Sequence, residues 1–258
     1  MRTIKKVASH IFIDGFGGMT QGLFATLIIG TMIQQIGLLI GGSTGNVIYL
    51  LGKAAAALTS AGIGVGVAVK YGESPLVTVS AAVAAMVGGY AGKITGGTFF
   101  VDGNAVLAGP GEPLGAFIAA FAGITCGHLV SGKTKVDIIV TPVITIGAGS
   151  VVGLLVGPPI SQMMTGLGSI INWATEQRPF IMGIVVSVVM GMVLTLPISS
   201  AALGIILNLS GLAAGAATIG CCCNMVGFAV ASYRENKFGG LVAQGLGTSM
   251  LQVPNIMR

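Results

Sequence analysis

Residues 179–233 read PFIMGIVVSVVMGMVLTLPISSAALGIILNLSGLAAGAATIGCCCNMVGFAVASY and contain no Asp, Glu, Lys or Arg. A soluble domain carries about 25% charged residues, because water must wet its surface. At about 20 residues for each crossing of the hydrocarbon core, this stretch is long enough for two or three transmembrane helices. The stretch therefore predicts a chain that lies in a lipid bilayer and is built from α-helices.

The composition of the whole chain extends this prediction to all 258 residues. Hydrophobic residues make up 53% of the sequence and charged residues only 7%, too few to cover a soluble fold of this size. The net charge is +5, and the basic residues lie singly and in pairs between apolar segments, as charges in loops do. They do not form a nucleic-acid-binding patch. We expect an all-α polytopic integral membrane protein whose partner is the lipid bilayer, with no nucleic acid.

Apolar segments of membrane length predict about eight transmembrane helices. Their expected positions are 19–41, 46–69, 74–91, 114–131, 137–157, 180–196, 198–216 and 217–232. Basic residues before the first span place the N-terminus in the cytoplasm, because cytoplasmic loops are enriched in Lys and Arg. The basic residues expected on the same side are Lys70, Lys133, Lys135, Arg234 and Lys237.

Two proline positions predict interruptions of these helices. Pro197 lies within TLPISSAA in the charge-free stretch, which predicts a broken or re-entrant helix and a candidate binding site at 195–200. Pro158 and Pro159 follow the span 137–157, so we expect that helix to end there and residues 158–175 to form an interfacial segment.

The segment 94–113 is rich in glycine and contains Asp102, Asn104 and Glu112, so it is too polar to face lipid. It is either a loop outside the membrane or a loop that enters a central cavity. Glu112 allows two readings as well. It could stabilise the N-terminus of the following helix by about 0.3–1 kcal/mol, or accept hydrogen bonds from substrate hydroxyls.

Glycine accounts for 43 residues and often recurs every four positions inside the apolar spans. This spacing puts small residues on one stripe of a helix and predicts close helix packing in lipid. The stripes are Gly62/Gly66, Gly149/Gly153/Gly157, Gly183/Ser187/Gly191 and Gly211/Gly215.

Cysteine and histidine give no sign of a metal or catalytic centre. Cys221, Cys222 and Cys223 are consecutive, so on a helix they point in three directions and cannot all bind one ion. We expect packing roles for them and for Cys126, an interfacial position for His128, and neither metal nor cofactor. No nucleotide-binding loop or catalytic triad is recognisable, so no catalytic residue is predicted.

Residues 140–202, VTPVITIGAGSVVGLLVGPPISQMMTGLGSIINWATEQRPFIMGIVVSVVMGMVLTLPISSAA, resemble the EIIC membrane subunit of the bacterial sugar phosphotransferase system. The likeness is to the fructose type and its stand-alone relatives, and it covers roughly 114–258. It rests on the Gly-Pro-Pro break, the segment with Trp173, the Pro-small-Ala-Ala motif, and GLGTSMLQVPN at 245–255 in place of the family's Gly-x-Thr-Glu-Gly motif.

The resemblance implies a substrate site between 195–200 and 245–255. The expected hydrogen-bonding or site-forming residues are Pro197, Ser199, Ser200, Thr248, Ser249, Gln252 and Asn255, with Glu112, Asp102 and Asn104 completing the cavity. The fructose type carries Asn-Lys and Thr-Glu in these motifs, where this chain has Ser199-Ser200 and Thr248-Ser249. Hydroxyls thus replace the charged groups that would bind a sugar.

The resemblance further implies a single EIIC-like transmembrane domain over 1–258, shortened at its C-terminus, in the bacterial inner membrane. Such a permease would move a small sugar-like substrate, with phosphorylation by phosphocarrier IIA and IIB proteins in trans, and would form a homodimer. At most it would be the membrane component of a phosphotransferase. The alternative is a non-phosphorylating transporter or membrane sensor for a less polar ligand on the same scaffold.

Overall fold

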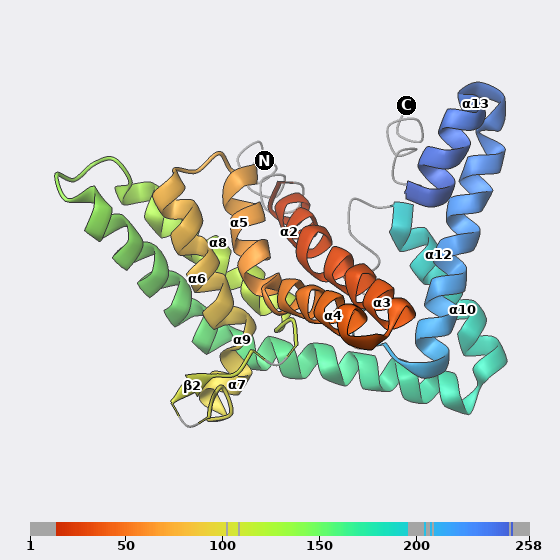
Figure 1. The fold of residues 1–258 in the computed structure, drawn as a ribbon, viewed down its shortest axis with the longest axis horizontal. Helices are drawn as coiled ribbons and strands as arrows, with labels where there is room; N and C mark the ends of the chain where they lie inside the picture. The colour runs from red at the N-terminus through yellow and green to blue at the C-terminus, as the bar shows by residue number, and fades with distance from the viewer. Residues whose placement is uncertain are drawn as a thin grey trace, which may run out of the picture. The chain divides into compact units, whose positions relative to one another are not determined.

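The computed structural model describes residues 14–101, 103–107, 109–195, 204, 207, 209–247 and 249, and these residues are predominantly helical (Figure 1). The elements are α2 (Phe16–Leu23), the π-helix η2 (Phe24–Ile28), α3 (Ile29–Ile40), α4 (Gly42–Ala57), α5 (Thr59–Lys70), α6 (Pro75–Gly89), α7 (Ala91–Thr95), β1 (Phe100–Val101), β2 (Asn104–Ala105), α8 (Pro113–Val130), α9 (Asp137–Gln177), α10 (Pro179–Thr195), α12 (Gly211–Ala231), α13 (Tyr233–Val242) and the π-helix η3 (Ala243–Gly247).

The chain forms two compact units, residues 1–162 and residues 163–258. That both belong to one EIIC-like transmembrane domain stays a prediction.

The first unit begins with a helical hairpin. α2, η2 and α3 form one apolar run of 25 residues, Phe16–Ile40, long enough to cross a bilayer. Gly41 and Gly42 then reverse the chain with φ angles of 65° and 64°, a left-handed conformation that glycine adopts without steric cost. α4 returns alongside α3 (Figure 1). The sequence thus supplies both the long apolar arm and the turn that folds it back.

Glycines face each other along this hairpin. A methyl group added at Gly18 would lie 2.6 Å from the carbonyl oxygen of Gly66, and one added at Gly30 would lie 2.8 Å from that of Gly52. The other facing pairs are Gly22 with Gly62 and Gly37 with Gly45. Because no side chain separates the helices, their backbones touch, which is how small residues favour helix association in lipid. The predicted packing stripe at Gly62/Gly66 is confirmed.

Small residues also form the core between α5, α6, α8 and α9. A methyl group at Gly115 would lie 2.8 Å from the carbonyl oxygen of Gly88, and one at Gly149 would lie 2.6 Å from that of Ala119. The fully buried apolar residues here include Ile63, Val67, Val77, Ala84, Ala116 and Ala119. Gly153 and Gly157 pack in the same way, so the predicted stripe on α9 is confirmed.

In the second unit α10 packs against α12. A methyl group at Gly191 would lie 2.9 Å from the carbonyl oxygen of Gly220, and Val186, Met190 and Ala217 form a buried apolar cluster. The remaining glycines of the predicted stripes in this unit have no partner among the described residues, so their packing stays a prediction. Methyl groups added at the predicted contact positions Gly183, Gly211 and Gly215 would meet no described atom within 4 Å.

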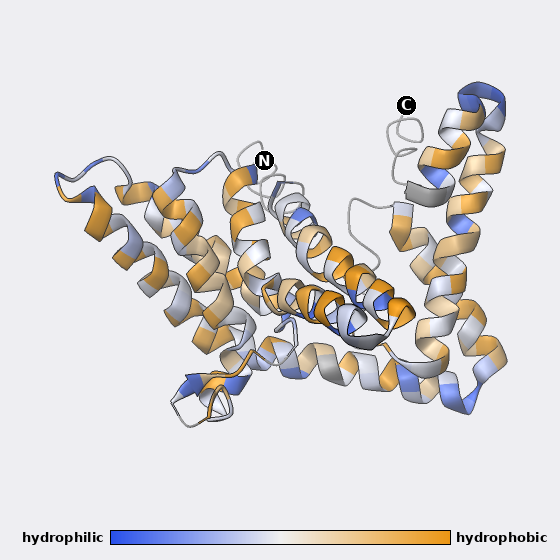
Figure 2. Ribbon diagram, viewed as in Figure 1, coloured by the Kyte–Doolittle hydropathy of each residue, from blue (hydrophilic) through white to orange (hydrophobic). Residues whose placement is uncertain are grey.

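Apolar side chains cover the outside of both units, as expected for surfaces solvated by lipid. Leu39 is 87% exposed, Phe180 81% and Leu155 71%, values that a water-soluble surface would not favour. Figure 2 shows hydrophilic residues gathered at the connections, such as those between α8 and α9 and between α12 and α13. Lipid is therefore the solvent that this surface fits.

Four described helices are long and apolar enough to cross a membrane: Phe16–Ile40, Pro113–Val130, Asp137–Gln177 and Gly211–Ala231. The bent pair α4 and α5 gives a fifth candidate, and α6 and α10 are shorter apolar helices. These elements correspond to the predicted spans, except for 198–216. Residues 198–203 of that span lie outside the described residues, and its last six residues, 211–216, belong to α12. The total of eight stays a prediction.

The predicted end of a helix at Pro158 was wrong. α9 continues through Pro158 and Pro159 to Gln177, so 158–175 belongs to the same helix as 137–157. A proline removes one hydrogen bond and crowds the preceding turn, but neighbouring groups in membrane helices often tolerate this. Gly157, which has no side chain, precedes the pair and lessens the crowding.

Candidate functional site

The helical arm opposite α2 and α3 is interrupted at Leu58. α4 and α5 meet there at 53°, and Leu58 has non-helical angles of φ −87° and ψ 11°. An interruption leaves backbone carbonyls without their helical amide partners, and in lipid such groups need partners from the protein. The sequence did not predict this break, because no proline or glycine marks position 58.

Hydroxyl groups provide the missing partners. Thr59 donates its side-chain hydrogen bond to the carbonyl of Ala56 at 2.6 Å, and the Tyr90 hydroxyl lies 3.2 Å from the carbonyl oxygen of Ala57. Tyr90 also lies 2.5 Å from the carbonyl oxygen of Gly109, so its single hydrogen is shared between two acceptors. Thr59 and Tyr90 are buried. Buried hydroxyl groups therefore surround the break and bond its free carbonyls.

The end of the polar segment 94–113 is fixed against this break. The Ser60 hydroxyl donates to the carbonyl of Pro110 at 3.0 Å, and the amide of Glu112 donates to the carbonyl of Gly89 at 2.7 Å. Gly111 has φ 75°, and a methyl group there would lie 2.5 Å from the Ser60 oxygen. Residues 109–112 therefore pack into the first unit, whereas the β1–β2 hairpin before them is exposed.

Glu112 caps α8, the simpler of its two predicted roles. Its Oε1 accepts a hydrogen bond from the amide of Leu114 at 3.1 Å, and its Oε2 accepts one from the amide of Gly115. Pro113 follows at the first helical position, where a missing amide hydrogen costs nothing. Glu112 lies just ahead of the candidate span. Burial raises the pKa of its carboxyl above the ordinary range, although the two amide hydrogen bonds act to lower it.

Polar and titratable groups gather at the α5–α6 and α8–α9 connections of the first unit. Nδ1 of His128, 71% exposed, lies 2.9 Å from Oε1 of Glu73, 9% exposed. The hydroxyls of Ser74 and Ser131 are 3.0 Å apart and join the same two connections. Burial, and then the nearby charge of Asp14, raise the pKa of Tyr71 to about 12. His128 thus sits at a polar helix end, as its predicted interfacial position requires.

In the second unit the predicted residue Ser249 meets a partner that the sequence did not indicate. The Ser249 hydroxyl donates a hydrogen bond to Oδ1 of Asn224 on α12 at 2.5 Å, and Ser249 is fully buried. Gln244 on η3 makes a parallel contact, since its Nε2 donates to the Ser232 hydroxyl at 2.9 Å. The chain after α13 therefore runs back along α12 and is held by two side-chain hydrogen bonds.

Gln244 retains one unpaired group. Gln244 is only 3% exposed, and its side-chain oxygen Oε1 has no hydrogen-bond partner among the described residues. Exchanging the oxygen and nitrogen of the amide would only exchange the unpaired group, since Ser232 can pair with either atom. Buried polar groups without partners are uncommon and often mark places where a ligand or water binds.

The other predicted site residues fall into two groups. Pro197, Ser199, Ser200, Thr248, Gln252, Asn255 and Asp102 lie outside the described residues. Asn104 is exposed in β2 and takes part in a local interaction. Glu112 belongs to the first unit and Ser249 to the second.

The sequence missed the residues that surround the two described polar centres. Tyr90 and Ser60 act at a break that no proline or glycine marks, and Asn224 pairs with a serine from a later segment. A signal was present for Asn224, because an amide inside a charge-free apolar span must find a partner in lipid. The neighbouring Cys221 lies with its sulfur 3.7 Å from the carbonyl oxygen of Met190, and all four cysteines are free thiols.

Helices of membrane length with lipid-compatible surfaces define an all-α membrane protein. Residues 13–258 match the family described as "Phosphotransferase system, EIIC", and the chain belongs to this family. The resemblance read from 114–258 is thereby confirmed, and the match extends it over the N-terminal half. No curated protein and no solved structure gives a significant match. The chain is thus a membrane transporter component of the phosphotransferase-system type.

Proposed function

We propose that this chain is the permease of a phosphotransferase-type system that binds a small sugar-like substrate and moves it across the bacterial inner membrane. Phosphorylation is carried out by separate phosphocarrier IIA and IIB proteins. Membership of the EIIC family supports this proposal. No described group of three or more His, Cys, Asp or Glu residues could hold a metal ion, so the proposal assigns no metal chemistry to the described part of the chain.

The observation that carries the proposal is the hydrogen bond between Ser249 and Asn224. It joins the carboxamide of Asn224 on α12 to the hydroxyl of Ser249, which lies in the segment 245–255 that the family resemblance singled out. Sugar hydroxyls both donate and accept hydrogen bonds, and a serine with an asparagine offers both functions without a charge. This pair can therefore exchange its internal hydrogen bond for bonds to a substrate.

The proposed site combines these two residues with those that the sequence indicated. Ser199, Ser200, Thr248, Gln252 and Asn255 would add further hydrogen-bonding groups, and Pro197 would interrupt the helix between them. Glu112, Asp102 and Asn104 remain candidates for substrate contacts on the basis of the sequence. Glu112 already accepts two amide hydrogen bonds, so its contribution would use its remaining acceptor capacity.

The proposal has a definite membrane arrangement. Eight spans with the N-terminus in the cytoplasm would place Lys70, Lys133 and Lys135 on the cytoplasmic side. Two copies would pair as a homodimer. Cysteine accessibility at both ends of the helices and cross-linking in native membranes test these two statements independently of substrate binding.

Substrate binding is tested with purified protein in lipid nanodiscs and radiolabelled hexoses, hexitols and disaccharides. We expect one class to bind, and Ser199→Ala/Ser200→Ala and Ser249→Ala to weaken it. Ser43→Ala is the matched control, because Ser43 is an exposed hydroxyl at the α3–α4 turn. The absence of binding across all three classes, with wild type and variants alike, would contradict the proposal. Addition of phosphocarrier proteins then tests whether bound sugar becomes phosphorylated.

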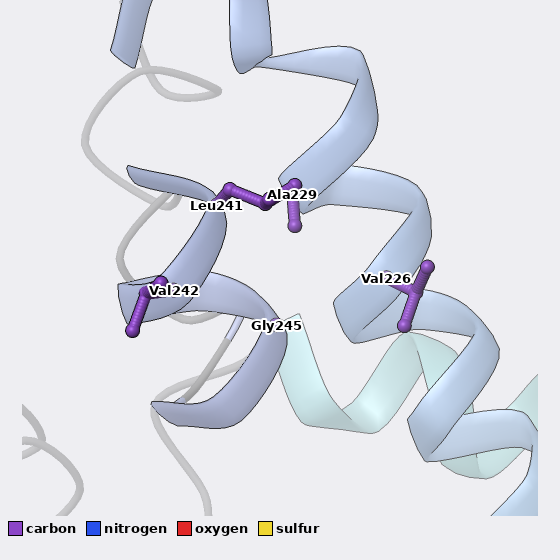
Figure 3. Close-up of a pocket in the computed structure, with 5 residues that line it drawn as sticks. All are labelled: Val226, Ala229, Leu241, Val242 and Gly245. Carbon is purple, nitrogen blue, oxygen red and sulfur yellow. The ribbon is translucent and has the colours of Figure 1, made fainter. Parts of the chain in front are cut away.

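A second candidate is a non-phosphorylating transporter or membrane sensor for a less polar ligand. It is favoured by the entirely apolar lining of the pocket between α12 and α13 with η3, formed by Val226, Ala229, Leu241, Val242 and Gly245 (Figure 3). Apolar ligand density in an experimental structure, together with no sugar binding, would favour this candidate over the first.

A further inference from the structure

The pocket between α12 and the α13–η3 segment is suited to hydrocarbon. It has a volume of about 330 Å³, and Figure 3 shows Val226 and Ala229 on one wall and Leu241, Val242 and Gly245 on the other. The pocket is open to the outside, and Val226 and Val242 are 55% and 40% exposed. Since lipid tails solvate such a surface, an acyl chain can enter the pocket without displacing water or leaving a polar group unpaired.

A basic turn stands at the end of the helix that forms this pocket. Arg234 and Lys237 are exposed in the turn between α12 and the rest of α13, with Glu235 between them. Neither basic side chain forms an ion pair with a described acidic residue. Lys237 has φ 52° and ψ −154°, a backbone conformation that non-glycine residues adopt only when the surroundings enforce it. The turn thus carries two cations that pair with no acidic residue in the described part of the chain.

The distance between the basic turn and the pocket fits the dimensions of a bilayer leaflet. Ala229 precedes Arg234 by five residues, which corresponds to about 7–8 Å along a helix at 1.5 Å per residue. The polar region of each leaflet is about 5–8 Å thick, half the difference between the whole bilayer and its hydrocarbon core. With Arg234 at the level of the phosphates, the pocket lies where the acyl chains begin.

We propose that this part of the protein binds one anionic phospholipid of the surrounding bilayer. One acyl chain occupies the pocket lined by Val226, Ala229 and Val242, and the phosphate lies against Arg234 and Lys237. The apolar lining selects a hydrocarbon chain, and the two cations select a negative headgroup. This inference does not depend on which substrate is transported, since none of the residues that line the pocket is among the proposed substrate contacts.

The test is native mass spectrometry of the purified chain in a neutral detergent. Dioleoyl phosphatidylglycerol and dioleoyl phosphatidylcholine, which have the same chains, are titrated separately. We expect tighter binding of phosphatidylglycerol. Each basic side chain near a lipid surface adds about a fivefold gain in affinity, so Arg234→Gln/Lys237→Gln should weaken phosphatidylglycerol binding about 30-fold. Arg178→Gln, which removes an exposed charge elsewhere in the unit, should leave it unchanged.

A second pair of variants tests the pocket. Val242→Trp places a large side chain on a partly exposed wall and should weaken binding of both lipids, whereas Val230→Trp, at an exposed position on α12 outside the pocket, should not. If Val242→Trp is not monodisperse, Val226→Trp replaces it. Equal binding of the two lipids to the wild type would overturn the proposal. So would displacement of phosphatidylglycerol by an equal concentration of glycerol 3-phosphate, because the headgroup alone would then suffice.

Discussion

Replacing Gly18 by alanine tests the glycine contacts that hold the N-terminal hairpin together. The new methyl group would lie 2.6 Å from the carbonyl oxygen of Gly66 and 2.7 Å from Cα of Val67. Both neighbours are backbone atoms and cannot rotate away. Restoring an ordinary separation of 3.4 Å requires α2 to move by about 0.8 Å, the difference between 3.4 and 2.6 Å.

This displacement sets the expected cost of Gly18→Ala. Inserting a methyl group into a packed interface that cannot relax costs about 1–3 kcal/mol. Gly147→Ala is the matched control, because Gly147 is exposed on α9 and a methyl group there would meet nothing within 4 Å. Alanine is favoured over glycine in helices by up to about 1 kcal/mol, so the control should be neutral or stabilising. The two variants should differ by about 1–3 kcal/mol, because the helix preference for alanine applies to both and only the backbone overlap separates them.

The assay is reversible unfolding by sodium dodecyl sulfate in mixed micelles, followed by far-ultraviolet circular dichroism. Helix content reports on the whole chain, whereas fluorescence of the single tryptophan, Trp173, reports on the second unit. Gly18→Ala should lower the unfolding midpoint seen by dichroism. Equal midpoints for Gly18→Ala and Gly147→Ala would show that the glycine contacts do not limit the approach of α2 to α5.

Substitutions at three further residues test individual polar groups by the same unfolding assay. Tyr90→Phe should cost about 1–3 kcal/mol, because it leaves the carbonyl of Ala57 at the helix break without its hydroxyl partner; an unchanged midpoint would argue against that role. Ser249→Ala should cost a similar amount by leaving Asn224 unpaired, and Ser249→Thr, which keeps the hydroxyl, should recover part of the loss. Burial raises the pKa of Glu112, so the folded state binds its proton more tightly and stability should fall as pH rises above 4.5; Glu112→Gln should flatten this slope.

Apolar length predicted most of the described helices because lipid imposes a minimum span on any crossing. The expected spans 19–41 and 114–131 correspond to Phe16–Ile40 and Pro113–Val130. The stripe Gly62/Gly66 was also predictable, since a four-residue repeat places both glycines on one face. Composition and periodicity were therefore sufficient for the helices themselves and for part of their packing.

Interruptions of the helices were not predictable from single residues. Pro158 and Pro159 indicated a break where α9 continues, whereas Leu58 gave no signal where the helix bends by 53°. The bend depends on partners distant in sequence, such as Tyr90, and no local pattern reveals them. For the same reason Ser249 could be named as a candidate while Asn224, 25 positions earlier, could not be identified as its partner.

The glycine pairs have a mechanical consequence for the N-terminal hairpin. Gly22 and Gly30 are eight residues apart, whereas the glycines that face them, Gly62 and Gly52, are ten apart. Between these contacts the returning arm, α4 with α5, therefore has two more residues than the arm that it faces. The break at Leu58 accommodates them. The contacts on both sides of Leu58 therefore fix the number of residues between Gly52 and Gly62, because inserting or removing one residue there would turn one run of glycines away from its partners.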